Sequence, residues 1–210
     1  MKDIVEHRTW RYAAKKFDPQ KKVAQTDIET LIEATRLSAS SYGLQPYHVF
    51  VIADPQLRER LKAASYGQDQ ITDASHLIVF AHASDFGDEL VEDFVENLSQ
   101  TRNIPLEGLQ GYAAFMKSRL VALPRESKGD WAARQTYIAF SNMMQAAAEL
   151  HIDSCPLEGF QAHQYNEILG LGAKNLNAVV ALAVGYRSPK DETQALPKVR
   201  KSKEALFTLI

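Results

Sequence analysis

The feature that most restricts the fold is a short segment, residues 76–81, that is apolar on both of its alternating faces. Successive side chains of a strand point to opposite faces of a sheet, so a strand without a polar face is buried on both sides. We therefore expect helices to cover both faces of the sheet that contains this segment.

Two further segments, residues 47–52 and 177–185, are rich in β-branched and other apolar residues and predict strands. Between them, residues 131–150 hold no Gly or Pro and are apolar nearly all round, which predicts a buried central helix with Ser127 before it as a cap. Residues 152–160 are expected to run extended. Other helices are expected over residues 26–36, 55–65, 85–102, 106–123 and 161–169, the first with Thr26 and Glu29 as a capping box.

Composition favours one domain over residues 1–210 and limits the classes of partner. The 24 basic and 26 acidic residues give a net charge of −2, so no general attraction to nucleic acid or to an anionic membrane is expected. A single cysteine, Cys155, excludes an internal disulfide framework and fits a reducing compartment. With no signal peptide and no apolar run long enough to cross a bilayer, the expected location is the cytoplasm.

A hydroxyl-rich loop, residues 37–48, joins a predicted helix to a predicted strand and is called the serine loop below. Ser40 and Ser41 offer donors and acceptors at short reach, Gly43 permits a positive φ, and Pro46 removes a backbone N–H. A loop of this kind on rigid supports is typical of a ligand site. The alternative is an ordinary helix-to-strand turn filled with polar residues.

Cations gather near both ends of the chain. In residues 10–17 they alternate with aromatic and small residues, which indicates either a phosphate contact or a solvated basic surface. Residues 186–210, here called the tail, are basic in the middle and end in the apolar run 205–210. Such a run needs a surface to pack on, and a second subunit is one candidate. A basic tail also leaves open a nucleic-acid-binding module.

Common catalytic and metal motifs are missing from the sequence. It has no Gly-rich phosphate loop ending in Gly-Lys-Ser/Thr, no His-Glu-x-x-His and no paired cysteines, so no metal is expected. Gly170 and Gly172 precede a strand rather than follow one, unlike a dinucleotide fingerprint. Cys155 has no neighbouring base in the sequence that would make it a nucleophile.

Five segments, taken together and in order, resemble the FMN-dependent nitroreductase family. They are residues 11–17, 40–47, 73–76, 156–160 and 196–200, and their spacing covers nearly the whole chain. The resemblance implies an α+β fold, a three-layer α/β/α sandwich with a mixed central sheet. It also implies an intertwined homodimer with two flavins at the subunit interface, the tail of each chain packing on the partner subunit.

The same resemblance implies the residues of the site. By position, Arg11, Lys198 and Arg200 match the phosphate clamp, and Lys15 matches the residue that places positive charge near the pyrimidine end of the flavin. The serine loop would come from the other subunit. The cofactor-binding residues expected in this way are Arg11, Tyr12, Ala13, Lys15, Ser40, Ser41, Gly43, Gln68, Gln70, Pro156, Leu157, Glu158, Gly159, Lys198 and Arg200.

At four positions the chain departs from the family pattern. Ala13 stands where a serine is usual and Gly43 where an asparagine is usual. Gln68 and Gln70 stand where many relatives carry Asn and Lys, which replaces a charge by a neutral amide. At Ala13 and Gly43, some side-chain bonds to the cofactor are therefore expected to be missing or replaced by backbone and water. The charge lost at Gln70 is expected to change the reduction potential of the flavin.

The function implied is hydride transfer from NAD(P)H through FMN to a flat acceptor such as a nitroaromatic or a quinone, by a ping-pong exchange. The flavin supplies the chemistry, so no catalytic acid or base is assigned. Tyr42, Tyr112 and Phe115 are candidates for walls of the acceptor site, with core packing as the alternative for Phe115. Dehalogenation, flavin breakdown, or a non-catalytic FMN-binding or sensor protein would share all of these motifs.

Overall fold

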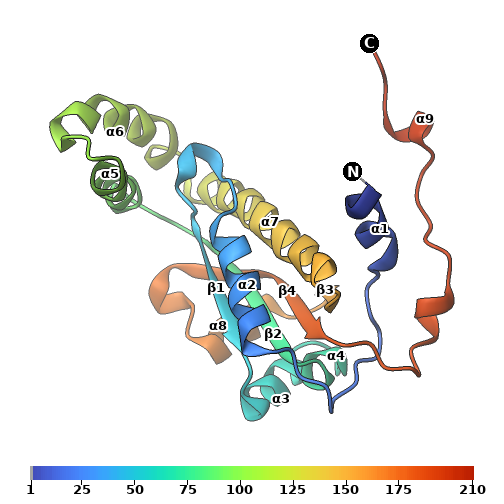
Figure 1. Cartoon of the computed structure of the whole chain (residues 1–210). Coiled ribbons are helices and arrows are strands. Elements are labelled where there is room, and N and C mark those ends of the chain that lie inside the picture. The colour runs from blue at the N-terminus through green and yellow to red at the C-terminus, as the bar shows by residue number, and fades with distance from the viewer. Residues whose placement is uncertain (1) are drawn as a thin grey trace.

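The computed structural model describes residues 2–210 (Figure 1). All three predicted strands are confirmed, and a fourth, β3, forms where the chain was expected only to run extended. In chain order the elements are α1 (Lys2–Trp10), α2 (Gln25–Arg36), β1 (Tyr47–Ile52), α3 (Pro55–Ala63), α4 (Gln70–Asp73), β2 (His76–Ala83), α5 (Glu89–Arg102), α6 (Gln110–Met116), α7 (Arg125–Glu149), β3 (Asp153–Leu157), α8 (Ala162–Leu169), β4 (Leu176–Gly185) and α9 (Lys203–Leu206).

The four strands form one sheet in the order β1-β2-β4-β3, and each neighbouring pair is antiparallel. The α+β class is confirmed, but these strands are antiparallel throughout where a mixed sheet was expected. Within residues 2–210, parallel pairing is confined to the isolated bridge between Ala13 and Ser154. A bridge holds a single residue pair, so it does not extend into a further strand.

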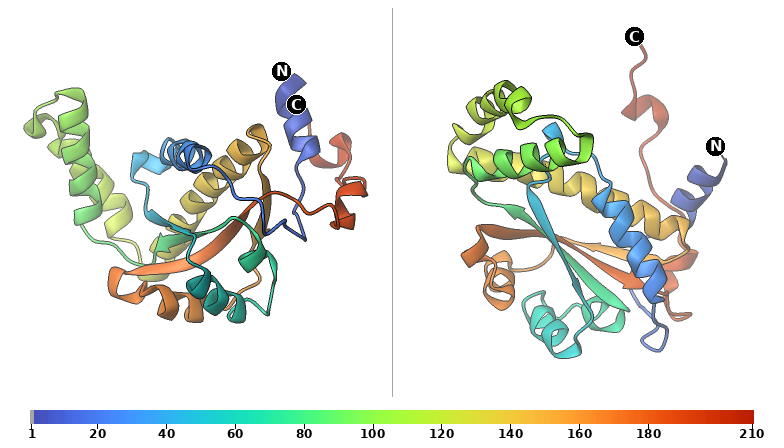
Figure 2. Two further views of the ribbon diagram at one scale, coloured as in Figure 1. Left: turned by 60° about the horizontal axis from the view of Figure 1, so that its bottom comes forward. Right: turned by 60° about the vertical axis from the view of Figure 1, so that its left-hand side comes forward.

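Two helical layers cover the sheet, as the doubly apolar strand predicted (Figure 2). Ile78 and Phe80 of β2 pack in the layer that contains α2 and α7. Leu77 and Val79, which alternate with them, pack in the opposite layer, formed by α3, α4 and α8. The three-layer α/β/α arrangement is therefore confirmed, and its two cores lie on either side of the sheet.

The long helix α7 is the central buried helix that the sequence predicted, with Ala139 and Met143 fully buried against the sheet. It begins at Arg125 after Pro124, six residues before the expected start, so Ser127 lies inside the helix and does not cap it. Gly129 does not interrupt it, because one glycine costs about 1 kcal/mol in a helix interior and the packing of a long helix outweighs that.

The predicted capping box of α2 is also wrong. The helix begins at Gln25, and Ala24 at the N-cap position makes no side-chain hydrogen bond. Thr26 already lies within the first turn, where its carbonyl accepts a hydrogen bond from the hydroxyl of Thr30 at 2.9 Å. The apolar face of α2 decides where the helix packs, as Ile28 and Leu31 are buried.

Helices α5 and α6 form a hairpin that projects from the sheet beside the serine loop (Figures 1 and 2). The hairpin has a core of its own, to which Val91, Val95 and Met116 contribute. Leu44 of the serine loop is buried in the same core. The serine loop and the hairpin are therefore packed together as one unit.

The tail leaves β4 and extends past α1, away from the sheet (Figure 1). Its apolar side chains are exposed in the single chain: Phe207 is 65% exposed and Leu209 97% exposed. The prediction that the tail packs on a second subunit is consistent with this exposure and stays a prediction. In the described part of the chain, no helix combines the length and the apolar character needed to cross a membrane.

A buried guanidinium group joins α3 to the turn before β2. Arg58 is 3% exposed and donates to the backbone carbonyls of Ile71 at 2.7 Å, Ala74 at 2.6 Å and Ser75 at 2.9 Å, and also to Thr72. These carbonyls end α4, where the helix dipole favours a cation. One side chain therefore satisfies a set of carbonyls that have few other partners at a helix end.

We expect Arg58→Met to lower the free energy of unfolding by about 3 kcal/mol, because the buried carbonyls lose their donors. Arg58→Lys should recover part of this loss. Arg60→Met, at an exposed position of the same helix, serves as the control and should change stability by less than about 0.5 kcal/mol. Urea denaturation of the three variants measures the effect, and equal losses for Arg58→Met and Arg60→Met would contradict it.

Candidate functional site

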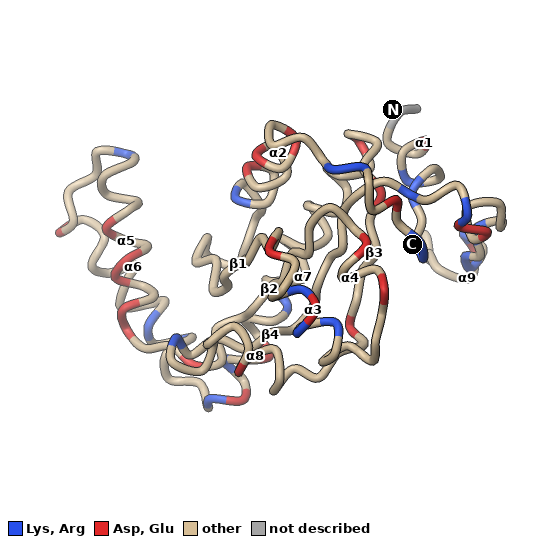
Figure 3. The backbone as a smooth tube through the Cα atoms, turned by 90° about the horizontal axis from the view of Figure 1, so that it is seen from below, with Lys and Arg blue, Asp and Glu red and all other residues tan. Residues whose placement is uncertain are grey.

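Three cations that are distant in sequence meet beside the C-terminal half of α7. Arg11 follows α1, Lys198 and Arg200 lie in the tail, and all three line a cavity of about 380 Å³ together with Arg8 and Gln145. The ammonium group of Lys198 donates to the backbone carbonyl of Arg11. Figure 3 shows basic positions of the tail beside α1. The structure thus brings together the three residues predicted as a phosphate clamp.

The electrostatics of this cluster fit an anionic group. Burial lowers the pKa of Lys198, and the nearby charges of Arg11 and Arg200 lower it further. Burial and then Arg200 lower the pKa of Arg11 in the same way. Among the described side chains, Arg11 also holds a buried donor, Nε, without a hydrogen-bond partner. Crowded cations with an unsatisfied buried donor match a dianionic phosphate, so the phosphate of FMN fits here.

Lys15, Gln68 and Gln70 line a second, open cavity of about 600 Å³. The side-chain amide of Gln68 donates to the backbone carbonyl of Gly159 at 2.7 Å. A β-carbon at Gly159 would lie 3.4 Å from that amide nitrogen, so glycine leaves room for the contact. The segment after α1, the connection before α4 and the turn after β3 are thereby gathered at one place. That the flavin ring binds there stays a prediction.

The segment 156–159 is fastened to α7 by a hydrogen bond that the sequence did not reveal. Pro156 and Leu157 end β3, and the carboxylate of Glu158 accepts a hydrogen bond from the hydroxyl of Tyr137 at 2.5 Å. Burial, and then this carboxylate, raise the pKa of Tyr137 to about 12, so its hydroxyl remains a donor at neutral pH. Tyr137 therefore helps to fix the position of this segment.

The serine loop is held in a strained conformation by its neighbours. Tyr42 and Gln45 both have positive φ, 56° and 43°, in a region that non-glycine residues rarely adopt. Gln135 of α7 accepts a hydrogen bond from the backbone N–H of Ser41 at 2.8 Å, and Ser40 Oγ accepts one from the N–H of Gln45 at 3.0 Å. Gln135 is buried and lies 94 residues from Ser41, so no local pattern could have identified it.

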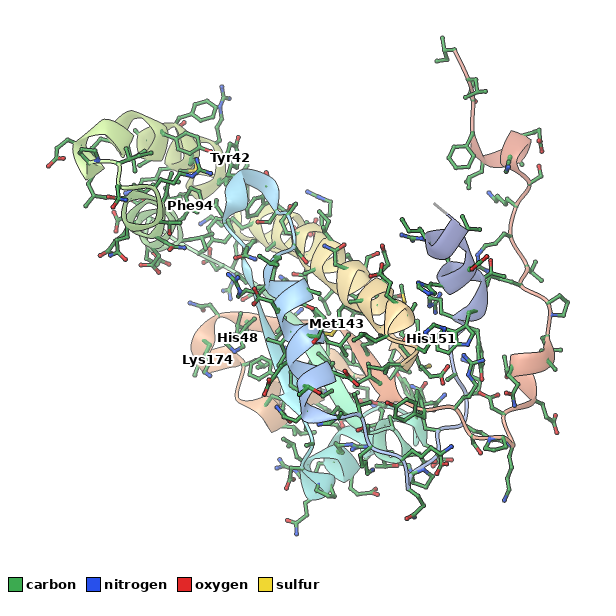
Figure 4. All side chains as sticks on the ribbon, viewed as in Figure 1. Tyr42, His48, Phe94, Met143, His151 and Lys174 are labelled. Atoms are coloured by element: carbon green, nitrogen blue, oxygen red, sulfur yellow. The ribbon has the colours of Figure 1, made fainter. Side chains whose placement is uncertain are left out.

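Aromatic side chains line the contact between the serine loop and the hairpin. Tyr42 and Phe115 meet edge to face with ring centroids 6.3 Å apart, and Figure 4 shows Tyr42 at this contact with Phe94 beside it. A β-carbon at Gly43 would lie 3.0 Å from the ring of Phe94, and Gly43 has a positive φ of 79°. Tyr112 and Phe115 are 39% and 46% exposed, so both predicted wall residues present surface to solvent.

Within one chain, the cation cluster and the serine loop do not meet. Ser41, one of the loop residues expected to reach the cofactor, is bound by Gln135, whereas the cavity of the cations is lined by Gln145 of the same helix. Ten residues of helix separate the two by roughly 15 Å along its axis. Figure 1 shows the loop at one end of α7 and α1 with the tail at the other. This separation agrees with the expectation that the two parts of a complete site come from different subunits.

Two of the predicted cofactor-binding residues, Tyr12 and Ala13, contact other parts of the chain. The hydroxyl of Tyr12 donates to Asp191 at 3.0 Å, and the guanidinium of Arg187 lies 4.6 Å from the centroid of its ring. Ala13 forms the bridge to Ser154 beside β3. Side-chain contact of Tyr12 with a ligand is therefore restricted, and its backbone and that of Ala13 are the groups available for one.

The described side chains include no cluster of three or more His, Cys, Asp and Glu residues that is able to hold a metal ion. Cys155 is fully buried, and burial raises the pKa of its thiol. A buried thiol with a raised pKa is a poor nucleophile. The polar groups that line the two cavities are therefore mainly cations and side-chain amides, which suit the binding of an anionic ligand.

Comparison with known proteins identifies the family. Residues 9–186 match the Nitroreductase family. The chain is 36% identical over 205 residues to Putative NAD(P)H nitroreductase YfkO of Bacillus subtilis, covering 91% of this chain and 93% of that protein. It is 40% identical over 205 residues to Putative NAD(P)H nitroreductase SAUSA300_2462 of Staphylococcus aureus, covering 91% of each.

Solved structures show the same fold. The Nitroreductase Family Protein from Streptococcus pneumoniae superposes with a TM-score of 0.83 at 22% identity, covering 98% of this chain and 99% of that one. A "putative nitroreductase in complex with FMN" from Exiguobacterium sibiricum superposes with a TM-score of 0.82 at 17% identity, covering 100% and 96%. Because the family match spans most of the chain and the fold agrees, this chain belongs to the nitroreductase family.

Proposed function

We propose that this chain is an FMN-dependent oxidoreductase that takes reducing equivalents from NAD(P)H and passes them to a flat acceptor such as a nitroaromatic or a quinone. The observation that carries the proposal is the cluster of Arg11, Lys198 and Arg200, with the orphaned Nε of Arg11 beside it. The names of the curated relatives support NAD(P)H as the reductant, and the FMN complex of a structural neighbour supports the cofactor.

Different residues of this chain would bind different parts of the cofactor. The three cations, which line one cavity, would hold the phosphate, and Lys15 with Gln68 and Gln70, which line another, would bind the polar edge of the ring. Pro156, Leu157, Glu158 and Gly159 would border the opposite edge. FMN, when bound, supplies a ring that accepts and returns hydride. The protein supplies binding, orientation and positive charge, and charge from Lys15 near the ring favours its anionic reduced form.

The acceptor would bind against the aromatic surface between the serine loop and the hairpin. Tyr42 and Phe115 meet there, and Tyr112 lies three residues before Phe115 on α6 with its side chain partly exposed, so these rings would offer flat apolar walls. In this proposal Ser40, Ser41 and Gly43 reach the cofactor of a second copy of the chain. The exposed apolar end of the tail would pack on that copy too, and a homodimer would then be needed for a complete site.

The first test is the visible absorption spectrum of the purified protein, recorded anaerobically before and after NADPH and then NADH. We expect a yellow protein whose flavin absorbance is bleached by at least one of the two, and whose colour returns with a nitroaromatic or quinone acceptor. A protein that binds FMN and is bleached by neither donor would instead be a flavin-binding or sensor protein. A protein that stays colourless with added FMN would refute the proposal.

Sites shared between subunits predict complementation in mixed dimers. Arg11→Ala/Lys198→Ala should damage the clamp, and Ser40→Ala/Ser41→Ala should damage the loop. Coexpression under two different tags isolates the mixed dimer, in which one site has both defects and the other has neither. We expect one FMN per mixed dimer to bind with wild-type affinity, measured by titration.

Each parent dimer is the control and should lack any wild-type-affinity site. If every chain built its own site, the mixed dimer would have no such site either. That result, or a protein that remains monomeric, would contradict the shared site.

The lowered pKa of Lys198 predicts a pH dependence of FMN binding. Phosphate favours charged Lys198, so the affinity should be greatest at neutral pH. It should fall as the pH rises through the pKa of Lys198 in the free chain, which lies below the ordinary lysine value. Lys198→Arg should bind FMN with little dependence on pH up to 9.5, because the guanidinium stays charged. Fluorescence titrations from pH 7 upward measure this, and a wild-type affinity with the same pH dependence as that of Lys198→Arg would contradict it.

A further inference from the structure

Asp191 is a buried carboxylate at the point where the chain leaves β4 for the tail. It is 1% exposed and immediately precedes the short helical turn Glu192–Ala195. Neither the family motifs nor any local pattern drew attention to it. Its position matters because the tail beyond it holds Lys198 and Arg200, two of the three cations of the proposed phosphate clamp.

The two oxygens of this carboxylate bind two distant segments of the chain. Oδ2 accepts hydrogen bonds from the hydroxyl of Tyr12 at 3.0 Å and from the backbone N–H groups of Lys15 at 2.7 Å and Lys16 at 3.2 Å. Oδ1 accepts one from the N–H of Thr193 at 3.0 Å. One side chain therefore joins the segment after α1 to the beginning of the tail, about 180 residues further along.

Both segments need such a connection, because neither is part of a regular helix or strand where the cations lie. Other contacts join the same two segments: the bridge between Phe17 and Arg187, the hydrogen bond from the N–H of Ser188 to the carbonyl of Lys16 at 2.9 Å, and the one from Lys198 to the carbonyl of Arg11. Burial is the first cause of the lowered pKa values of Arg11 and Lys198, and the charges of the neighbouring cations lower both pKa values further. This repulsion opposes the approach of the two segments, and Asp191 adds to the contacts that offset it.

The protonation state of Asp191 suits this task. Burial by itself would raise its pKa, but the hydrogen bonds from Lys15, Lys16, Tyr12 and Thr193 outweigh burial, and the pKa lies below the usual aspartate range. The carboxylate is therefore ionised at neutral pH and accepts every one of these hydrogen bonds. An asparagine of the same shape has an NH₂ group in place of one oxygen and would meet some of these donors with a donor.

We infer that Asp191 is a positioning residue that assembles the phosphate clamp, by fastening the segment that holds Arg11 and Lys15 to the tail that holds Lys198 and Arg200. This inference rests on the proposed function. Asp191 does not touch the phosphate; it acts through the backbone of Lys15 and Lys16 and through Thr193. Its loss should consequently weaken the recognition of the phosphate more than that of the ring.

The test compares FMN with riboflavin, which has the same ring and no phosphate. In Asp191→Asn we expect the dissociation constant for FMN to rise at least tenfold and that for riboflavin to rise less than threefold. Tyr12→Phe removes a single hydrogen bond to the same carboxylate and should change the FMN constant in the same direction by about two- to fivefold. If Asp191→Asn fails to fold, the dissociation constants of Tyr12→Phe test the inference instead.

Asp54→Ala is the matched control for a general loss of stability. Asp54 is another hydrogen-bonded carboxylate, which accepts from the N–H of Leu57 at 2.6 Å at the start of α3, far from the cations in the sequence. Its removal should lower the melting temperature and leave the ratio of FMN to riboflavin affinity unchanged.

The outcomes separate the inference from the proposed function. If Asp191→Asn raises the dissociation constants for FMN and riboflavin by the same factor, the inference is overturned and Asp191 has a structural role only. If Asp191→Asn does not fold, an unchanged ratio of the two constants in Tyr12→Phe overturns it in the same way. A wild-type protein that binds neither flavin would instead refute the proposed function. A wild-type preference for FMN that disappears in Asp191→Asn and persists in Asp54→Ala would establish the positioning role.

Discussion

The burial of β2 on both faces is the constraint on which the rest of the structure depends. Its alternating apolar side chains require a helical layer on each side, and α7 and α2 on one side and α3, α4 and α8 on the other meet that requirement. This leaves no room for a ligand within the sheet. The candidate site therefore lies at the periphery, in segments that follow or connect the packed elements.

Because those peripheral segments lack a backbone ladder, side chains hold them in place. The ion pair between Asp153 and Arg187, 2.5 Å long, anchors the root of the tail to β3, and Arg187 also lies over the rings of Trp10 and Tyr12. Asp191 adds the hydrogen bonds to the same region. Asp153 and Asp191 thus hold the tail against β3 and against the segment after α1. In the single chain the three cations of the proposed clamp already line one cavity, and a site formed in advance would lower the cost of ordering it on binding.

Much of the fold follows from local pattern. Strand alternation and the glycine-free apolar stretch predicted the sheet segments, the two covering layers and α7, since these properties repeat over a few neighbouring residues. The start of α7 and the cap of α2 were predicted wrongly, because tertiary packing outweighs the small preferences at helix ends. The four strands of the single chain are antiparallel, where a mixed sheet was expected. Gln135, Tyr137 and Asp191 were missed since their partners lie 94, 21 and up to 179 residues away.

The sequence by itself determined the family, the layered α+β fold and the identity of the three cations, because motifs and periodicity are written in residues close to one another. Only the tertiary structure decided that Arg11, Lys198 and Arg200 share one cavity, and that the serine loop lies at the other end of α7 in the same chain. The physical reason is that these contacts join distant segments through hydrogen bonds and burial. The geometry of these contacts depends on the packing of the whole sheet and its helices, so it cannot be predicted from the spacing of residues along the chain.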